Sequence, residues 1–226
     1  PFVSKATGVP LARVAARVLL GEKLDGMDLP DDLPLLNVAV KEAVFPFNKF
    51  PDADPLLGPE MRSTGEVMGF ADSFGLAFAK AQIAADGSLP LSGNVVVTVH
   101  ERDKPAATPI IRRLHELGFE IKATAGTARY LSRRGVPCET VLKVHEGRPH
   151  ILDLLLSGEV QLLVNTPLGK DAQHDDYMIR QAAISRGIPY TTTLSAASAA
   201  ADAIIALRSR RLSVYSLQER IAALNG

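Results

Sequence analysis

The second half of the chain alternates short apolar segments with segments that have helical spacing. Five segments have the composition of buried strands: 94–99, 119–123, 139–142, 160–165 and 189–192. Five others place apolar residues on one helical face: 105–117, 127–134, 149–157, 175–186 and 195–208. Strands this apolar are buried on both faces, and strands separated by helices run parallel. The pattern therefore predicts an α/β domain with a five-stranded parallel sheet and helices on both faces.

Residues 1–93 have a less regular pattern. Three segments read as extended or as an ordered loop: 1–4, 39–47 and 50–60. Two others, 10–21 and 69–85, have the spacing of amphipathic helices, the first opened by proline and followed by glycine. A Gly, Ser and Pro-rich stretch at 86–93 then marks a boundary. We therefore expect two units, residues 1–85 and 94–226, joined by a linker at 86–93.

The charge balance limits the possible partners. Lysine plus arginine and aspartate plus glutamate are equal at 25 each, so the formal net charge is zero. A neutral chain has no overall field to attract polyanions, so nucleic acid is not expected and any phosphate site must be local. The basic group Arg208, Arg210 and Arg211 is too short to change this and is interpreted as a solvated helix end.

Two further observations concern the compartment. Cys138 is the single cysteine, which excludes an internal disulfide and fits a reducing cytosol. No apolar run approaches the ~20 residues of a membrane span, and the N-terminus does not have the pattern of a signal peptide. We expect a soluble, cytoplasmic protein without membrane contact.

The carboxyl ends of the predicted strands carry side chains suited to binding phosphate. Lys104 follows the first strand, Thr124, Gly126 and Thr127 follow the second, and Lys143 follows the third. Ligands of parallel sheets bind at this edge. A helix N-terminus offers free N–H groups and partial positive charge, and the lysines add full charges. Each residue alone is more often a helix cap or a solvated cation. Together they predict a site for a phosphate monoester.

Other residues near the same edge could bind the rest of a nucleotide. Asn165 and Asp175 could meet ribose hydroxyls, whereas Val144, Ile151 and Ile179 could line a pocket for the base. Taken singly, each of these five is better interpreted as an ordinary cap or core residue. The site prediction therefore rests on the phosphate residues.

Zinc and dinucleotide chemistry are not predicted. His145 and His150 are five apart with Gly147 and Pro149 between them, whereas a metalloprotease helix needs histidines four apart. The glycine-rich loops that bind dinucleotides or nucleoside triphosphates, and the Gly-x-Ser-x-Gly elbow, are absent from the sequence.

Four segments resemble the C-terminal quarter of the carbamoyl-phosphate synthase large subunit. They are PFVSKATGVP at 1–10, PFNKFP at 46–51, DPLLGPEMRSTGEVMG at 54–69 and KVHEGRPH at 143–150. The resemblance covers essentially the whole chain. It implies that residues 1–85 are the C-terminal remnant of the second ATP-grasp synthetic domain. It also implies that residues 94–226 are a regulatory domain similar in fold to methylglyoxal synthase.

The resemblance implies a role in making carbamoyl phosphate for pyrimidine and arginine biosynthesis. The family uses bicarbonate, ammonia from a glutaminase small subunit, two ATP and Mg²⁺, and its large subunits often self-associate through their C-terminal regions. In the family, the ligands of the second ATP's metal precede the segment that resembles residues 1–10. The chain alone is therefore expected to be inactive, with no catalytic residue, metal or cofactor of its own.

The resemblance also implies effectors. Bacterial members bind UMP as inhibitor, IMP as activator and ornithine as activator. The matching phosphate positions are Lys104, Thr124, Thr127 and Lys143, with Asn165 and Asp175 at the ribose and Thr98 at a neighbouring hydroxyl position. The matching ornithine positions are Glu42, Tyr190 and Thr192. Pro167 stands where the family often has a threonine and removes a hydroxyl and a backbone donor, although Lys170 keeps a cation nearby. The sequence therefore does not determine which nucleotide binds.

A methylglyoxal synthase acting on dihydroxyacetone phosphate is the alternative. The acid and base candidates are His100, Asp103, His174 and Asp175. Such enzymes carry a Gly-Gly-Asp-type loop after the third strand, where this chain has Glu-Gly-Arg-Pro at 146–149. The regulatory interpretation is therefore preferred.

Overall fold

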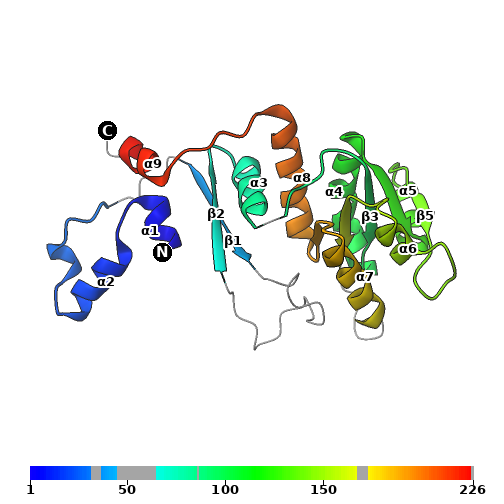
Figure 1. Ribbon diagram of the computed structural model, residues 1–226, viewed down its shortest axis with the longest axis horizontal. Helices are drawn as coiled ribbons and strands as arrows, with labels where there is room; N and C mark the ends of the chain where they lie inside the picture. Colours follow the sequence, from blue (N-terminus) through cyan, green and yellow to red (C-terminus); the bar gives the residue numbers. More distant parts are fainter. Residues whose placement is uncertain (32–36, 45–64, 86, 167–172, 225–226) are drawn as a thin grey trace.

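The computed structural model describes residues 1–31, 37–44, 65–85, 87–166 and 173–224 (Figure 1). Its elements form an elongated molecule. A parallel sheet lies at one end, short N-terminal helices lie at the other, and a strand pair with two helices lies between them (Figure 1). No helix in this part of the chain is long and apolar enough to cross a membrane.

The predicted parallel sheet is confirmed. Its strands are β3 (Asn94–Thr98), β4 (Glu120–Thr124), β5 (Glu139–Val141), β6 (Leu162–Asn165) and β7 (Tyr190–Thr191). They are ordered β5-β4-β3-β6-β7, and every pair is parallel. The most apolar strand, β3, takes the central position, as expected for a strand buried on both faces.

Helices cover both faces of this sheet. They are α4 (Lys104–Glu116), α5 (Ala125–Ser132), α6 (Ile151–Leu156), α7 (Gln173–Ser185) and α8 (Leu194–Ser209). The side chains of β3 alternate between the two faces. Val95 and Val97 join a core with α4, α5 and α8, whereas Val96 joins a core with α6 and α7. This two-sided burial confirms the predicted α/β fold.

A strand pair precedes the sheet. Strands β1 (Val38–Val44) and β2 (Gly65–Ala71) are antiparallel, and helix α3 (Phe74–Ala84) packs between them and α8. Gly69 and Gly75 permit this packing: a Cβ at Gly69 would lie 1.8 Å from the Ala77 carbonyl oxygen, and one at Gly75 would lie 2.6 Å from that of Asp202. Ala79 of α3 belongs to the core of the parallel sheet. Hydrophobic contacts thus cross the segment 86–93, and the division into two domains stays a prediction.

The expected strand at residues 1–4 is wrong. Helix α1 (Phe2–Thr7) forms there and ends at Gly8, whose φ of 77° is in the left-handed region that favours glycine. A short apolar run does not by itself distinguish strand from helix. Helix α2 (Leu11–Leu19) follows as predicted, but none of its residues is buried. A short 3₁₀ helix, η1 (Leu24–Gly26), comes next.

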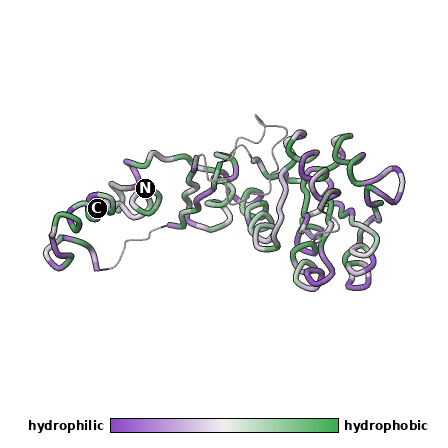
Figure 2. Tube along the Cα trace, turned by 90° about the horizontal axis from the view of Figure 1, so that it is seen from below, coloured by the Kyte–Doolittle hydropathy of each residue, from purple (hydrophilic) through white to green (hydrophobic). Residues whose placement is uncertain are grey.

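Two further boundaries differ from the sequence prediction. The helix expected over 69–85 begins only at Phe74, because the preceding residues pair with β1 as the end of β2. The unpredicted helix α9 (Leu217–Leu224) follows a segment that runs back from α8 past β2, and α9 lies beside α1 in both views (Figures 1 and 2). The predictions for 45–47 and 50–60 lie outside the described residues.

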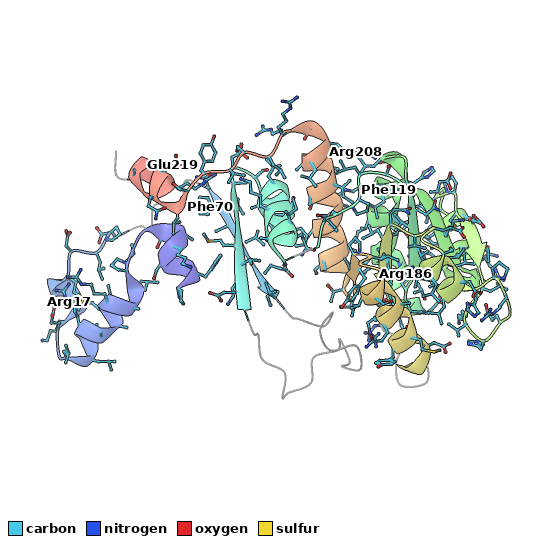
Figure 3. All side chains as sticks on the ribbon, in the orientation of Figure 1. Arg17, Phe70, Phe119, Arg186, Arg208 and Glu219 are labelled. Carbon is cyan, nitrogen blue, oxygen red and sulfur yellow. The ribbon has the colours of Figure 1, made fainter. Side chains whose placement is uncertain are left out.

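Arg208 is exposed in the last turn of α8, as expected from the sequence, and it also makes specific contacts there. Its Nε donates to the Leu91 carbonyl oxygen at 3.0 Å, and its Nη1 donates to that of Leu117. The guanidinium also lies 5.6 Å from the centre of the Phe119 ring (Figure 3). Arg208 therefore ties the end of α8 to the segment before β3 and to the loop before β4.

Candidate functional site

The structure brings Lys104 and Gly126 together at the carboxyl edge of the sheet. Lys104 opens α4, and its side chain is buried and paired with Glu101. A Cβ built on Gly126 would lie 3.3 Å from the Lys104 ammonium nitrogen. The ammonium therefore lies directly over the first turn of α5, where backbone N–H groups and partial positive charge gather. Glu101, which sequence reasoning missed, accompanies the cation.

Two threonine hydroxyls lie at the start of the same helix. Thr124 ends β4 and is the N-cap residue of α5, and Thr127 is in the first turn. Both are buried, and their hydroxyl oxygens are 3.4 Å apart. The N-cap side chain makes no capping hydrogen bond to α5. Both hydroxyls thus lie next to the first-turn N–H groups of α5, and N–H groups at a helix N-terminus are donors suited to an anion.

Lys143 and Thr98 lie at the ends of the neighbouring strands. Lys143 follows β5 and is half-buried, and its amide donates to Glu146 Oε2 at 2.8 Å. In the described parts of the chain, no carboxylate pairs with its ammonium. Thr98 ends β3, and its carbonyl oxygen accepts a hydrogen bond from the Thr166 amide at 3.1 Å. These positions place a second cation and a third buried hydroxyl on the same edge as α5.

The two residues predicted to bind ribose, Asn165 and Asp175, contact different partners. Asp175 Oδ2 accepts a hydrogen bond from His145 Nδ1 at 3.0 Å, which joins α7 to the loop after β5. Asn165 instead donates to Asp176 Oδ1 at 3.2 Å. Both Asn165 and Asp176 are fully buried, whereas Asp175 is not. Only Asp175 therefore has exposed surface to offer a ligand.

A buried cation that sequence reasoning missed, Arg180, lies on helix α7 with Asp175 and Asp176. Arg180 is 1% exposed, and its guanidinium nitrogens have no hydrogen-bond partner among the described residues. The Oδ1 atom of Asn165 is likewise unpaired. Arg180 is one turn after Asp176, and that four-residue spacing is the signal that could have placed both side chains on the buried face of α7. Unpaired buried polar groups are exceptional in folded proteins and are often found at functional sites.

The three predicted base-pocket residues share one hydrophobic cluster. Ile151 and Ile179 belong to the buried core between α6, α7 and the sheet, and Val144 packs against it. Ile151 is 1% exposed and Ile179 is 5% exposed, so they act as core residues. Val144 is half-buried and is the one of the three with surface available to a ligand.

The residues that match the ornithine site lie on two different sheets. Glu42 is on β1, where its carboxylate hydrogen-bonds Gln82 of α3. Tyr190 is on β7 and Thr192 directly follows that strand. Burial raises the pKa of the Glu42 carboxyl, and the hydrogen bond with Gln82 opposes this. Glu42 is thus a half-buried carboxylate without a described cationic partner.

Glu42→Gln should increase stability at neutral pH. The raised pKa means that the folded state holds the Glu42 proton more tightly than the unfolded state does. Stability therefore falls as pH rises from the ordinary glutamate pKa of about 4.3 through the higher folded value. Urea unfolding of both proteins over about pH 4 to pH 8 measures this, and the advantage of the variant should grow through that window.

A matched control lies on the paired strand. The hydrogen bond with Lys41 lowers the pKa of Glu66, so its stabilising contribution is present above the ordinary glutamate pKa and lost as pH falls. Glu66→Gln should therefore lose stability relative to wild type as pH rises. An advantage of Glu42→Gln that does not change with pH would contradict the prediction.

The residues considered for acid–base or metal chemistry make local hydrogen bonds and ion pairs. His100 Nδ1 accepts from the Arg102 amide, and Asp103 pairs with Arg102 at 3.5 Å. His150 forms a capping box with Asp153 at the start of α6. No group of three or more metal-ligating side chains that could hold a metal lies within the described ranges. Pro167, Lys170 and the side chain of His174 lie outside them.

Comparison with known proteins found a family match for part of the chain and similar proteins for most of it. The family described as MGS-like domain matches residues 106–192. The carbamoyl phosphate synthase large chain of Gemmatimonas aurantiaca is 59% identical over 219 residues, which are 97% of this chain and 20% of that protein. The corresponding large chain of Archaeoglobus fulgidus is 50% identical over 97% of this chain and 20% of its own length. A Methanopyrus kandleri protein named carbamoyl phosphate synthase large chain, C-terminal section, is 50% identical over 97% of this chain and 42% of its own length.

Residues 106–192 thus match the MGS-like domain, and 97% of the chain is homologous to a C-terminal section of carbamoyl phosphate synthase large chains. The chain spans about a fifth of the length of the first two relatives and under half of the third. The MGS-like match includes the α5 threonines, Lys143 and Asp175, whereas Lys104 lies just before its first residue. The phosphate-suited edge is thus mostly within the MGS-like domain.

Proposed function

We propose that the MGS-like domain binds the phosphate of a nucleotide effector of the UMP or IMP type. The observation that carries the proposal is the Lys104 ammonium over Gly126 at the start of α5. Helix N–H groups, two buried threonine hydroxyls and a buried lysine supply donors from two elements. Lys143 adds the further charge that a phosphate dianion needs.

The proposed role of this binding is regulation of carbamoyl phosphate synthesis for pyrimidine and arginine biosynthesis. Similarity to large chains supports a polypeptide that works with the rest of a large subunit. A glutaminase small subunit and a second copy of the chain are further proposed partners. ATP and Mg²⁺ would belong to the full cytoplasmic enzyme, and residues 1–226 alone would not catalyse the reaction. Regulation would then be a coupling free energy between this site and active sites elsewhere.

Ornithine is the second proposed effector. Its ammonium would meet the Glu42 carboxylate, whose raised pKa reflects burial without a described cation. Tyr190 and Thr192 would supply hydroxyls from the end of β7. An ornithine-dependent rise in melting temperature that Glu42→Gln removes would support this assignment, and an unchanged rise would exclude Glu42 from the site.

Lys143→Ala should abolish stabilisation by the nucleotide. A ligand at 100 times its dissociation constant adds about 2.7 kcal/mol to the unfolding free energy. Thermal unfolding with UMP, IMP and dihydroxyacetone phosphate measures this in wild type and variant. Because Lys143 has no described ion pair, its loss should leave the unliganded melting temperature nearly unchanged.

Lys23→Ala is the matched control, because Lys23 is an exposed lysine that lies far from the parallel sheet in the chain. It should keep the full nucleotide response. Equal responses of the two variants would mean that the phosphate site is misassigned. Absence of any nucleotide response would contradict the regulatory proposal. Measurable methylglyoxal production from dihydroxyacetone phosphate would contradict it too and would favour the enzymatic alternative.

A further inference from the structure

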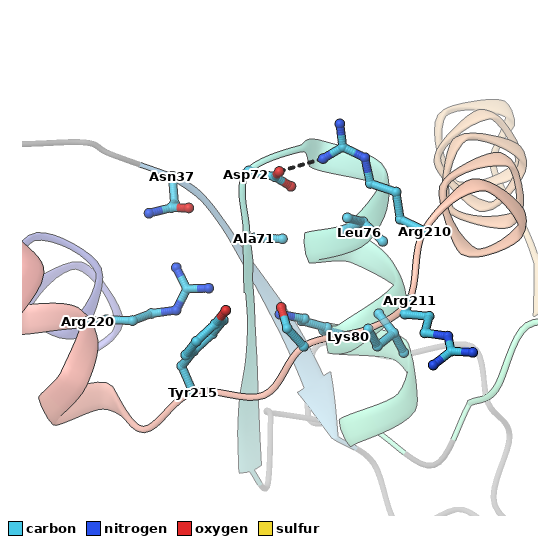
Figure 4. A pocket seen from close by; sticks show the side chains of 11 residues that line it. Asn37, Ala71, Asp72, Leu76, Lys80, Arg210, Arg211, Tyr215 and Arg220 are labelled. Carbon is cyan, nitrogen blue, oxygen red and sulfur yellow. Dashed lines mark hydrogen bonds and ion pairs between the residues drawn. The ribbon is translucent and has the colours of Figure 1, made fainter.

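A cation-rich cavity lies on the opposite side of α8 from the parallel sheet. It has a volume of about 310 Å³ and is enclosed by β2, α3 and the segment that runs from α8 to α9 (Figure 4). Its charged lining residues are Asp72, Lys80, Arg210, Arg211 and Arg220. A volume of this size is at the lower end of the range for small-molecule sites.

Positive charge exceeds negative charge in this cavity. Arg210 pairs with Asp72 at 2.6 Å, which leaves three cations. Lys80 donates to the Phe70 carbonyl oxygen at 2.9 Å, which is a neutral acceptor. For Lys80, Arg211 and Arg220, no ion pair with a carboxylate exists within the described residues. The cavity therefore has a surplus of three positive charges.

The pKa of Lys80 is lowered in this cavity. Burial lowers the pKa of the Lys80 ammonium, the positive charge of Arg220 lowers it further, and Asp72 opposes the shift. Two cations that repel each other across one cavity are unfavourable unless an anion separates them. An anion placed between them would gain attraction to both and would raise the pKa of Lys80.

Arg220 is held in place by aromatic rings. Its guanidinium lies 4.4 Å from the centre of the Phe70 ring and 5.2 Å from that of Tyr215. In Figure 4 its side chain extends from α9 toward the cavity, beside Tyr215. Stacking leaves the edge of a guanidinium free to donate in its plane, which is the geometry that binds phosphate oxygens.

We propose that this cavity binds a small phosphate-bearing anion with two or more negative charges. Lys80 and Arg220 would contact the phosphate from opposite walls, and Arg211 would contribute at the entrance. A multivalent anion matches the surplus of three charges, whereas a single carboxylate would leave most of it uncompensated. The site is formed by the C-terminal segment against β2 and α3, so it is separate from the proposed nucleotide site at α5.

Pyrophosphate is the probe for the test. The full chain is labelled with ¹³C at the lysine ε carbon, and Lys80 is assigned with Lys80→Arg. Pyrophosphate should shift the Lys80 resonance and raise the pKa measured from it. Isothermal titration should show that Arg220→Gln weakens pyrophosphate binding by at least about tenfold, as expected for loss of charge-assisted hydrogen bonds.

Two control variants test whether pyrophosphate binds at this cavity and not elsewhere. Arg133→Gln removes an exposed arginine of the parallel-sheet region and should leave pyrophosphate affinity unchanged. Lys143→Ala weakens the proposed nucleotide site and should leave the Lys80 response intact. A Lys80 resonance that ignores pyrophosphate would overturn the proposal, and so would a response abolished by Lys143→Ala. If Arg220→Gln loosens α9, Arg211→Gln tests the same cavity from an exposed position and should also weaken binding.

Discussion

Gly69→Ala should destabilise the protein by about 3 kcal/mol or more, near or above the upper end of the usual cost of overpacking. A Cβ at Gly69 would lie 1.8 Å from the Ala77 carbonyl oxygen and 2.6 Å from the Ala81 amide nitrogen. Both atoms belong to the backbone of α3, so no side-chain rotation relieves the clash. The helix must move away from β2, and its contacts with α8 must loosen. Urea unfolding measures the loss.

Gly65→Ala is the matched control on the same strand. Among the described residues, its added Cβ would meet only the Val44 Cβ at 3.8 Å, which is an ordinary van der Waals distance. Neither glycine has a positive φ, so backbone strain does not distinguish them. Equal stabilities of the two variants would mean that β2 and α3 are not in such close contact.

Phe119→Ala should cost about 3 to 5 kcal/mol, the usual range for truncating a buried aromatic side chain. Phe119 is 1% exposed and lies in the core formed with α4, α5 and α8. Its removal leaves a cavity and also removes the ring beside which the Arg208 guanidinium lies. The unfolding free energy and the melting temperature should both fall.

Phe74→Ala makes the same chemical change at an exposed position. Phe74 is 45% exposed at the start of α3, and its ring is 5.9 Å from that of Phe78. The expected loss is about 0.5 to 1.5 kcal/mol beyond the smaller burial term, since only an aromatic pair is broken. Equal losses in the two variants would contradict the prediction that burial determines the cost of removing Phe119.

Much of the parallel-sheet region was predictable from sequence because its pattern is local and strong. Each strand is an apolar run, and each helix has an apolar face, so both types were located to within a few residues. In contrast, β2 was partly read as helix. Its two glycines weaken the strand pattern, and its pairing with β1 spans a long stretch of chain.

The candidate site was predictable in residue type but not in contacts. Strand ends located Lys104, Thr124 and Thr127, because parallel strands bring their carboxyl ends to one edge. The partners of Asn165 and Asp175 were not predictable, since which of two adjacent aspartates faces the sheet depends on how α7 is rotated. The cavity around Lys80 was likewise not predictable from the sequence. It requires α9 to return beside β2, and no local pattern encodes that return.

The sequence by itself determined the alternation of strands and helices, the two-sided burial of the sheet and the phosphate-suited residues at its edge. These follow from local periodicity, which reports which face of each segment avoids water. Only the tertiary structure decided the strand order, the packing of α3 between β2 and α8, and the approach of Arg211 and Arg220 in the C-terminal segment to Lys80 of α3. Those features depend on contacts between residues far apart in the chain, where glycine-permitted backbone approach and long-range charge pairing select one arrangement.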